Sequence, residues 1–125
     1  MVGHQEAENG IKGRIINIGD WATNRPYKNY LPYLVAKGGL STMTLALAKE
    51  LAPYIPVAMI QPAMIDPPAH LTEAEIQAVV AQTPLRRVGT STDVNRLILY
   101  LLEGTSFVTG VCYRVDGGRF LGVDS

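Results

Sequence analysis

Tyr33 and Lys37 are the two residues of this sequence whose types and spacing could move a proton between a protein and a ligand. They stand four positions apart in a segment with helical periodicity, so their side chains share one face of the helix. An ammonium group beside a phenol favours the phenolate and lowers a tyrosine pKa that is ordinarily about 10. A lowered pKa suits a proton donor or acceptor near neutral pH. The pair is short enough to arise by chance, and a solvated helix face is the alternative interpretation.

Further candidate residues stand where two predicted strands end. The apolar run Ile15–Ile18 predicts a strand that is covered on both faces, and Asp20 follows it, 13 positions before Tyr33. A second run, Val57–Ile60, leads into a loop that contains residues 62–65. Ligands of open parallel sheets bind at the carboxyl ends of the strands. Asp20 and this loop are therefore candidate site residues, with a simple turn cap as the alternative for Asp20.

The rest of the chain alternates helical and extended patterns. Helical periodicity spans about residues 29–51, a capping box predicts a short helix over 72–82, and a third helix is expected over 90–104. A last strand is expected over 108–115. The order strand, helix, strand, helices and strand predicts an α/β fold. Three strands are fewer than a central sheet normally has, so we expect one part of a doubly wound parallel sheet.

The long predicted helix has apolar residues such as Leu31, Val35 and Met43 at spacings of three and four, as a helix with one core-facing side would. Gly38 and Gly39 interrupt it. A glycine weakens a helix interior by about 1 kcal/mol relative to alanine, so we expect another backbone to pack closely there. An incomplete sheet should also expose a strand edge and apolar surface, which favours pairing between chains. We therefore expect a homo-oligomer.

Composition and charge exclude several classes of function. The 125 residues suffice for one domain, and 11 basic residues balance 11 acidic ones, so no global field attracts nucleic acid or an anionic membrane. No apolar run is long enough to span a membrane. One cysteine cannot form an internal disulfide, and the two histidines are isolated, so we expect no metal site. The polar N-terminus lacks a secretory signal, and these features together predict a cytoplasmic protein.

In order and spacing, the motifs resemble those in the C-terminal half of the short-chain dehydrogenases/reductases. That family has a polar catalytic residue 13 positions before a Tyr-x-x-x-Lys pair, a Pro-Gly loop after the next strand, and a terminal Thr-Gly segment that leads to Val-Asp-Gly-Gly. The corresponding residues here are Asp20, Tyr33, Lys37, Pro62–Ala63, Thr109–Gly110 and Val115–Gly118. The resemblance runs from about residue 12 to 121 and implies a single, partial Rossmann-like domain over residues 1–125.

Asp20 stands where the family usually has serine. An aspartate there, within Asp-x-x-x-Asn-x-Pro followed by Tyr-x-x-Tyr, resembles the pteridine reductase branch of the family. In this sequence the segment runs from Asp20 through Asn24 and Pro26 to Tyr30 and Tyr33. The resemblance implies reduction of a C=N bond in a pterin or dihydrofolate-like substrate, with NADPH preferred over NADH.

The resemblance also assigns roles to individual residues. Tyr33 would donate a proton, Lys37 would hold the nicotinamide ribose and lower the pKa of Tyr33, and Asp20 would be the third catalytic residue. Trp21 and Tyr30 would pack beside the substrate ring. The residues that border the nicotinamide would be Ile18, Gly19, Pro62, Ala63, Met64 and Ile65, with Ala63 in place of the usual glycine.

Two features of the family are absent from the sequence. Members are normally about twice as long, and their first half carries a Gly-rich turn that receives the cofactor pyrophosphate. No such turn occurs here, and the family's catalytic asparagine would fall before Met1, so we interpret the chain as the catalytic half of a reductase. Two alternatives stay open: a generic short-chain reductase of ketones or 3-oxoacyl substrates, and a non-catalytic remnant that packs against a partner.

Overall fold

Three strands form a parallel sheet in the computed structural model, which describes residues 10–124. The strands are β1 (Ile15–Ile18), β2 (Val57–Pro62) and β3 (Val111–Val115), and β2 lies in the middle of the sheet. The predicted α/β fold with a parallel sheet is confirmed. The polar N-terminal segment, residues 1–9, lies outside the described part of the chain.

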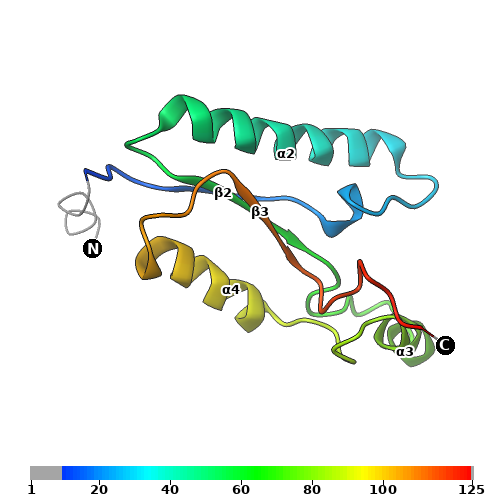
Figure 1. Cartoon of the computed structure of the whole chain (residues 1–125). Coiled ribbons are helices and arrows are strands. Elements are labelled where there is room, and N and C mark those ends of the chain that lie inside the picture. The colour runs from blue at the N-terminus through cyan, green and yellow to red at the C-terminus, as the bar shows by residue number, and fades with distance from the viewer. Residues whose placement is uncertain (1–9, 125) are drawn as a thin grey trace.

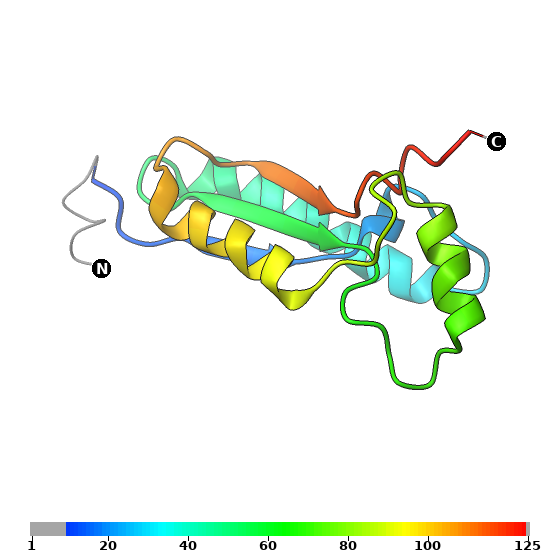
Figure 2. The ribbon, with the colours of Figure 1, turned by 90° about the horizontal axis from the view of Figure 1, so that it is seen from below.

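Helices cover both faces of the sheet (Figure 1). The long helix α2 (Leu31–Leu51) connects β1 to β2 on one face, and α4 (Ser91–Leu99), continued by the π-turn η2 (Tyr100–Gly104), lies on the other. Figure 2 shows α3 (Glu73–Ala81) beyond the carboxyl ends of the strands. A 3-10 turn, η1 (Trp21–Thr23), follows β1. Helices on both faces of a parallel sheet are the doubly wound arrangement.

The starts of α3 and α4 follow the local sequence. The side chains of Thr72 and Thr90 each accept a hydrogen bond from the backbone N–H three residues further on. The side chains of Glu75 and Asp93 return a bond to the backbone N–H of the cap residue, so both helices begin with a capping box. The predictions of a capping box at Thr72 and of Thr90 as an N-cap are confirmed.

Strand β2 continues to Pro62, two residues beyond its predicted end at Ile60. The starts of two other elements also differ from the prediction. Helix α2 begins at Leu31, because Asn29 has a φ of 73°, outside the helical region. Strand β3 begins at Val111 rather than at residue 108, because Gly110 turns with a φ of 70° directly before it. In both places a residue in the left-handed region sets the boundary, which the pattern of apolar residues does not reveal.

The apolar core lies between the sheet and α4. Ile60 has no exposed surface, and Ala58 and Leu101 are each 5% exposed. Half-buried apolar residues surround these three: Ile16, Val94, Leu97, Ile98, Val108, Tyr113 and Val115. Fully burying a large apolar side chain contributes about 1.5–3 kcal/mol, so Ile60 and Leu101 each contribute substantially to the stability of the described chain.

Helix α2 turns other side chains toward the sheet than the sequence predicts. Its buried residues are Thr44 and Ala48. Among the apolar residues that set the predicted periodicity, Leu31, Val35 and Met43 are 73%, 65% and 46% exposed. The other four are half-buried: Leu34, Leu40, Leu47 and Leu51. Because apolar residues occur on several sides of this helix, periodicity alone did not identify the inner one. The inner side carries small and polar residues instead.

The two glycines in the middle of α2 make no close contact. Apart from the helix's own backbone, nothing lies within 4 Å of a Cβ built at Gly38 or Gly39. The close backbone packing that we expected is not made within residues 10–124 and stays a prediction for contacts between chains. In this part of the chain, no helix combines the length and the apolar character needed to cross a lipid bilayer.

Candidate active site

Asp20 and Tyr33 are in direct contact at the carboxyl end of β1. The Tyr33 hydroxyl donates a hydrogen bond of 2.6 Å to Oδ2 of Asp20. Asp20 lies just beyond β1 and Tyr33 in the first turn of α2, so the connection between the two elements brings the pair together. Oδ1 of Asp20 accepts a bond of 2.8 Å from the N–H of Ala22 and caps η1. Asp20 is therefore both a turn cap and the partner of Tyr33.

Lys37 lies one turn after Tyr33 on the same side of α2. Its ammonium nitrogen donates a hydrogen bond of 3.4 Å to the carbonyl oxygen of Ile18, the last residue of β1. The same nitrogen is 5.9 Å from the centre of the Tyr33 ring. An ammonium group has three N–H donors, so two of them meet no acceptor in the described chain and are available to a ligand.

The pKa of Tyr33 moves in the direction opposite to our prediction. The Asp20 carboxylate accepts the phenolic hydrogen bond and, together with desolvation and the negative charge of Asp20, raises the pKa of Tyr33 from 10.0 to about 12. Lys37 does not offset this, because its ammonium group bonds to the Ile18 carbonyl rather than to the Tyr33 oxygen. In this arrangement the proton stays on Tyr33, which is a protonated donor and not a phenolate.

The segments that follow β1 and β2 leave the sheet at the same edge. Ile18 pairs with Ile60 in the parallel ladder, so Gly19 lies beside the end of β2. A Cβ on Gly19 would stand 2.7 Å from Sδ of Met59, a side chain with no exposed surface. The backbone passes Met59 this closely only because residue 19 is glycine.

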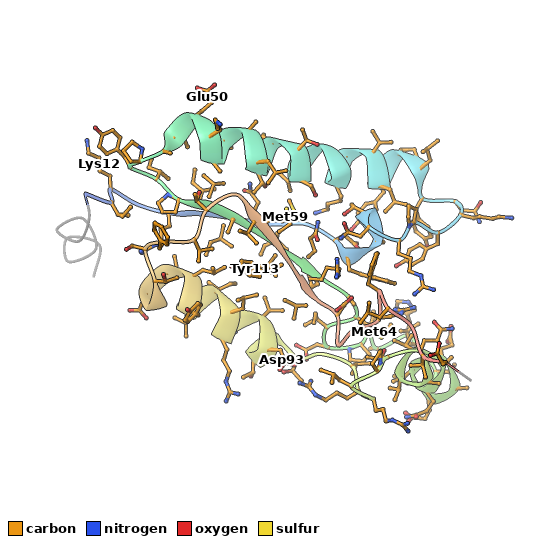
Figure 3. All side chains as sticks on the ribbon, in the orientation of Figure 1. Lys12, Glu50, Met59, Met64, Asp93 and Tyr113 are labelled. Atoms are coloured by element: carbon orange, nitrogen blue, oxygen red, sulfur yellow. The ribbon has the colours of Figure 1, made fainter. Side chains whose placement is uncertain are left out.

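The loop Pro62–Ile65 is tied to its surroundings through its backbone. The N–H of Ala63 donates a bond of 3.0 Å to the carbonyl oxygen of Val115, and the carbonyl oxygen of Met64 accepts one of 3.0 Å from the N–H of Gly89. Figure 3 shows Met64 at the carboxyl ends of the strands. The predicted cofactor-binding loop therefore has a fixed backbone at the edge that carries the candidate catalytic residues.

Trp21 and Tyr30, the predicted substrate contacts, differ in exposure. Trp21 is only 4% exposed, and its ring packs edge-on against Tyr27 with the ring centres 6.2 Å apart. Tyr27 in turn packs edge-on against Tyr30 at 5.6 Å. Tyr27 and Tyr30 are 47% and 53% exposed. The aromatic surface open to a ligand therefore comes from Tyr27 and Tyr30, whereas Trp21 supports it from the interior.

A buried polar network, which sequence reasoning missed, holds the segment after Asp20. Gln61 at the end of β2 is 3% exposed, and its side-chain oxygen accepts a bond of 2.8 Å from the amide of Asn24. Its amide nitrogen donates to the hydroxyls of Thr23 and Ser41 at 3.4 and 3.3 Å. Gln61 thereby joins η1 to β2 and α2. The signal in the sequence was one glutamine directly after an apolar run.

A cavity of about 430 Å³ opens on the other side of the loop after β2. Ala63 and Met64 line it, and the remaining lining residues come from α3, α4, the segment between them and the end of β3 with its following turn. Asp20, Tyr33 and Lys37 do not line it. Within residues 10–124, no three His, Cys, Asp or Glu side chains come together as metal ligands. The candidate catalytic residues therefore lie on an open edge and not inside this cavity.

The sequence is similar to those of known reductases. The family model described as Enoyl-(Acyl carrier protein) reductase matches residues 3–119. The 3-oxoacyl-[acyl-carrier-protein] reductase FabG of Pseudomonas aeruginosa is 34% identical over 113 residues, which cover 87% of this chain and 46% of that protein. The protein of the same name from Aquifex aeolicus is 37% identical over 112 residues, which cover 86% of this chain and 45% of that protein.

The fold is also similar to that of solved structures. A short-chain dehydrogenase/reductase from Brucella melitensis matches with a TM-score of 0.79 and 32% identity, over 85% of this chain and 44% of that one. The chain spans about half the length of the curated relatives it matches. The matched half carries the residues that meet at the carboxyl ends of β1 and β2.

Proposed function

The chain belongs to the short-chain dehydrogenase/reductase family, and we propose that it supplies the proton-transfer site of a nicotinamide-dependent reductase of carbonyl compounds. The observation that carries the proposal is the 2.6 Å contact between the Tyr33 hydroxyl and Asp20, with the Lys37 ammonium one turn away on α2. The 3-oxoacyl reductases among its relatives favour a keto substrate.

The residues at the carboxyl end of β1 fit the nicotinamide end of a dinucleotide. Gly19 carries no side chain, and Lys37 keeps N–H donors that no described residue takes. Lys37 would hold the ribose, and the residues bordering the ring would be Ile18, Gly19, Pro62, Ala63, Met64 and Ile65. Bound there, a reduced nicotinamide supplies the hydride for the substrate carbon. NADPH in preference to NADH rests on the resemblance to pteridine reductases alone.

Tyr33 supplies the proton in this mechanism. The substrate carbonyl oxygen replaces Asp20 as the acceptor of the Tyr33 O–H group and takes the proton as negative charge develops on it, so that C=O becomes CH–OH. Because Asp20 is the group that raises the pKa of Tyr33, its replacement makes the phenol more acidic at the moment of transfer. The phenolate that remains is stabilised by the Lys37 ammonium one turn away.

A pterin reductase is the second candidate, and Asp20 is the observation that favours it. Its carboxylate is held by the N–H of Ala22 and by the Tyr33 hydroxyl at the place where a serine hydroxyl is usual. A carboxyl group can pass a proton to a ring nitrogen, which a serine hydroxyl does poorly. The half-exposed rings of Tyr27 and Tyr30 offer a surface for a flat heterocycle.

We also propose that the protein associates with further copies of itself through α2. Leu31, Val35 and Leu45 of this helix are 73%, 65% and 51% exposed, which leaves apolar surface for a neighbouring helix. Gly39 on the same helix permits a close approach. If this surface binds a different protein and no reaction is catalysed, the chain is the non-catalytic remnant considered above.

The test is a fusion of this chain to the N-terminal half of the Pseudomonas aeruginosa relative, which would add a dinucleotide-binding turn. We expect oxidation of NADPH in the presence of a 3-oxoacyl thioester. Tyr33→Phe should reduce turnover about 100-fold or more, the usual scale of acid–base catalysis. Tyr100→Phe, which alters a tyrosine that is 55% exposed at the end of α4, is the matched control and should have no effect. A folded fusion that turns over no carbonyl compound or pterin, or that loses nothing with Tyr33→Phe, contradicts the proposal.

The choice between the two substrates depends on Asp20. In the same fusion, Asp20→Ser should reduce turnover of a dihydropteridine far more than turnover of a ketone if the carboxyl group serves as an acid, because serine can still hydrogen-bond a carbonyl group. Equal losses on both substrates would assign Asp20 a structural role as the cap of η1.

A further inference from the structure

A guanidinium group without a counter-ion lies on the ring of Trp21, at the start of the segment that follows Asp20, and it also lines the cavity of about 430 Å³. The Cζ atom of Arg119, in the turn after β3, is 4.7 Å from the ring centre of Trp21, the residue that directly follows Asp20. The Nε atom of Arg119 is buried and has no hydrogen-bond partner. Within residues 10–124, no carboxylate forms an ion pair with this side chain. A half-buried guanidinium with an unused buried donor is a place where an anion binds favourably.

The turn that carries Arg119 is fixed by hydrogen bonds. Both oxygens of Asp116 are used within it: one accepts the N–H of Gly118 and the other accepts the N–H of Phe120, each at 3.0 Å. From the segment after η1, Nη1 of Arg25 donates to the carbonyl oxygens of Arg119 and Phe120 at 3.0 and 3.1 Å. The backbone of Arg119 is thus attached to the segment that begins at Asp20, and its guanidinium rests on a buried indole.

The charges around this turn leave a positive excess. The Arg114 guanidinium stacks on the Phe120 ring at 4.2 Å, and its only ion-pair contact in the described chain is a long one of 3.8 Å with Asp116. Asp116 is engaged by backbone N–H groups, and Asp20 by Tyr33 and Ala22. Of the three arginines at this turn, only Arg114 has an ion-pair partner among the described residues, and that partner is already hydrogen-bonded to the backbone. The third arginine is Arg25, which connects the turn to the segment after η1 through its bonds to the Arg119 and Phe120 carbonyl oxygens.

We propose that Arg119 binds an oxyanion of the substrate, a carboxylate or phosphate group, while the reacting carbonyl of the same molecule faces Tyr33. This inference rests on the proposed function and narrows its substrate class to anionic carbonyl compounds. The planar guanidinium presents five N–H donors in a fixed fork that matches two oxygens of one oxyanion, and stacking on Trp21 holds its plane in place. Arg25 and Arg114 raise the local positive potential without using these donors.

Trp21 provides a direct measurement, because it is the only tryptophan in the chain. The chain is titrated with inorganic phosphate and, separately, with acetate, and the tryptophan emission is compared with a sodium chloride titration of equal ionic strength. An anion that engages the stacked guanidinium alters the environment of the indole. We expect a saturable change with phosphate, acetate or both, and a smaller, non-saturating change with chloride. Whether phosphate or acetate saturates first identifies the preferred headgroup.

Variants distinguish anion binding at Arg119 from non-specific anion binding. Arg119→Gln should raise the half-saturation concentration at least about tenfold, the loss expected when one charge-assisted contact is removed. Arg96→Gln removes the same charge from an exposed position on α4 and should leave the titration unchanged. If Arg119→Gln does not fold, Arg119→Lys keeps the charge and loses the planar fork, and it should weaken binding while the circular dichroism stays native.

Different measurements test the anion-binding role of Arg119 and the proton-transfer role of Tyr33, so either can fail without the other. A titration with phosphate and acetate that follows chloride, or a saturable change that survives in Arg119→Gln, overturns the role of Arg119 and leaves the proton-transfer site untouched. In the fusion, a neutral ketone tests Tyr33 alone. If the inference is right, an anionic ketone has a lower KM than a neutral one of equal size, and Arg119→Gln removes that difference without lowering kcat on the neutral ketone.

Discussion

The two faces of the sheet are packed with different kinds of side chain. Residues of β2 alternate between them: Ala58 and Ile60 belong to the apolar core beside α4, whereas Met59 and Gln61 contact α2. Figure 3 shows Met59 between the sheet and α2, and Tyr113 on the opposite side toward α4. The face beside α4 is filled with aliphatic groups. The face beside α2 carries amides, hydroxyls and a thioether, and it ends at the candidate active site.

The buried polar groups on the face beside α2 are hydrogen-bonded to one another. The Asn17 amide donates a bond of 3.0 Å to the Thr44 hydroxyl, which itself donates one of 2.9 Å to the carbonyl oxygen of Leu40. One such bond contributes about 0.5–1.5 kcal/mol net, and a fully buried large aliphatic side chain about 1.5–3 kcal/mol. Val57 and Met59, which alternate with Ala58 and Ile60 along β2, also have no exposed surface. The difference teaches that both helices stabilise the sheet, but only the face beside α2 combines apolar burial with hydrogen-bonded polar groups.

The largest expected effect is on the face beside α4. Ile60→Ala should lower the free energy of unfolding by about 2–5 kcal/mol, because it leaves a cavity in the apolar core. Glu50→Ala, at an exposed position near the end of α2, should change it by less than about 0.5 kcal/mol. Urea unfolding followed by circular dichroism measures both. Equal losses would remove the contrast between the two faces.

A smaller loss of stability is expected when the buried hydrogen-bond network on the face beside α2 is broken. Gln61→Met keeps the volume but leaves the Asn24 amide without its acceptor, so the free energy of unfolding should fall by about 1–3 kcal/mol. The same change should speed amide hydrogen exchange at Ala22, because the network holds η1 in place. Gln77→Met on the exposed side of α3 is the matched control. Exchange at Ala22 that stays unchanged would show that η1 does not depend on Gln61.

Variants at the start of α4 test whether the N-terminal cap of this helix adds to the stability of the fold, beyond what packing in the core provides. Thr90→Ala removes the capping hydroxyl and should lower the free energy of unfolding by about 1 kcal/mol. Thr92→Ala, at an exposed position within the same helix, should have almost no effect. A loss with Thr92→Ala as large as with Thr90→Ala would point to helix propensity and not to the cap.

The smallest effect on stability comes from the exposed contact between Tyr33 and Asp20. Because the pKa of Tyr33 in the folded chain lies above its ordinary value, the stability that this contact adds is present below about pH 10 and is lost as the pH rises toward about 12. Asp20→Asn should lower the pKa of Tyr33 toward 10, since the neutral amide no longer opposes the phenolate.

Ultraviolet absorbance during a pH titration measures this tyrosine when Tyr33→Phe is used as the reference. The last tyrosine to ionise in the wild-type chain should be missing in that variant. If Asp20→Asn leaves its pKa near 12, burial and not the carboxylate is the cause.

Local patterns in the sequence determined the elements and the pairing of the candidate catalytic residues. Short apolar runs were sufficient to predict β1 and β2, and two threonines followed three positions later by an acidic residue were sufficient to predict the starts of α3 and α4. The four-residue spacing of Tyr33 and Lys37 on one helix placed them on one side, and the strand end placed Asp20 beside them. These features depend on backbone geometry over a few residues, which the order of side chains specifies directly.

Only the tertiary structure decided which side of α2 faces the sheet, that Trp21 is buried, and that Asp20 raises the pKa of Tyr33. It also brought together Gln61 and Asn24, which are 37 positions apart, and placed the guanidinium of Arg119 on Trp21. Each of these depends on which distant segments lie at one edge of the sheet. A helix with apolar residues on several sides can pack against the sheet in more than one orientation, so its sequence does not specify the buried side. Burial and the nearest charge then set the chemistry of a side chain, and both are properties of its neighbours in space.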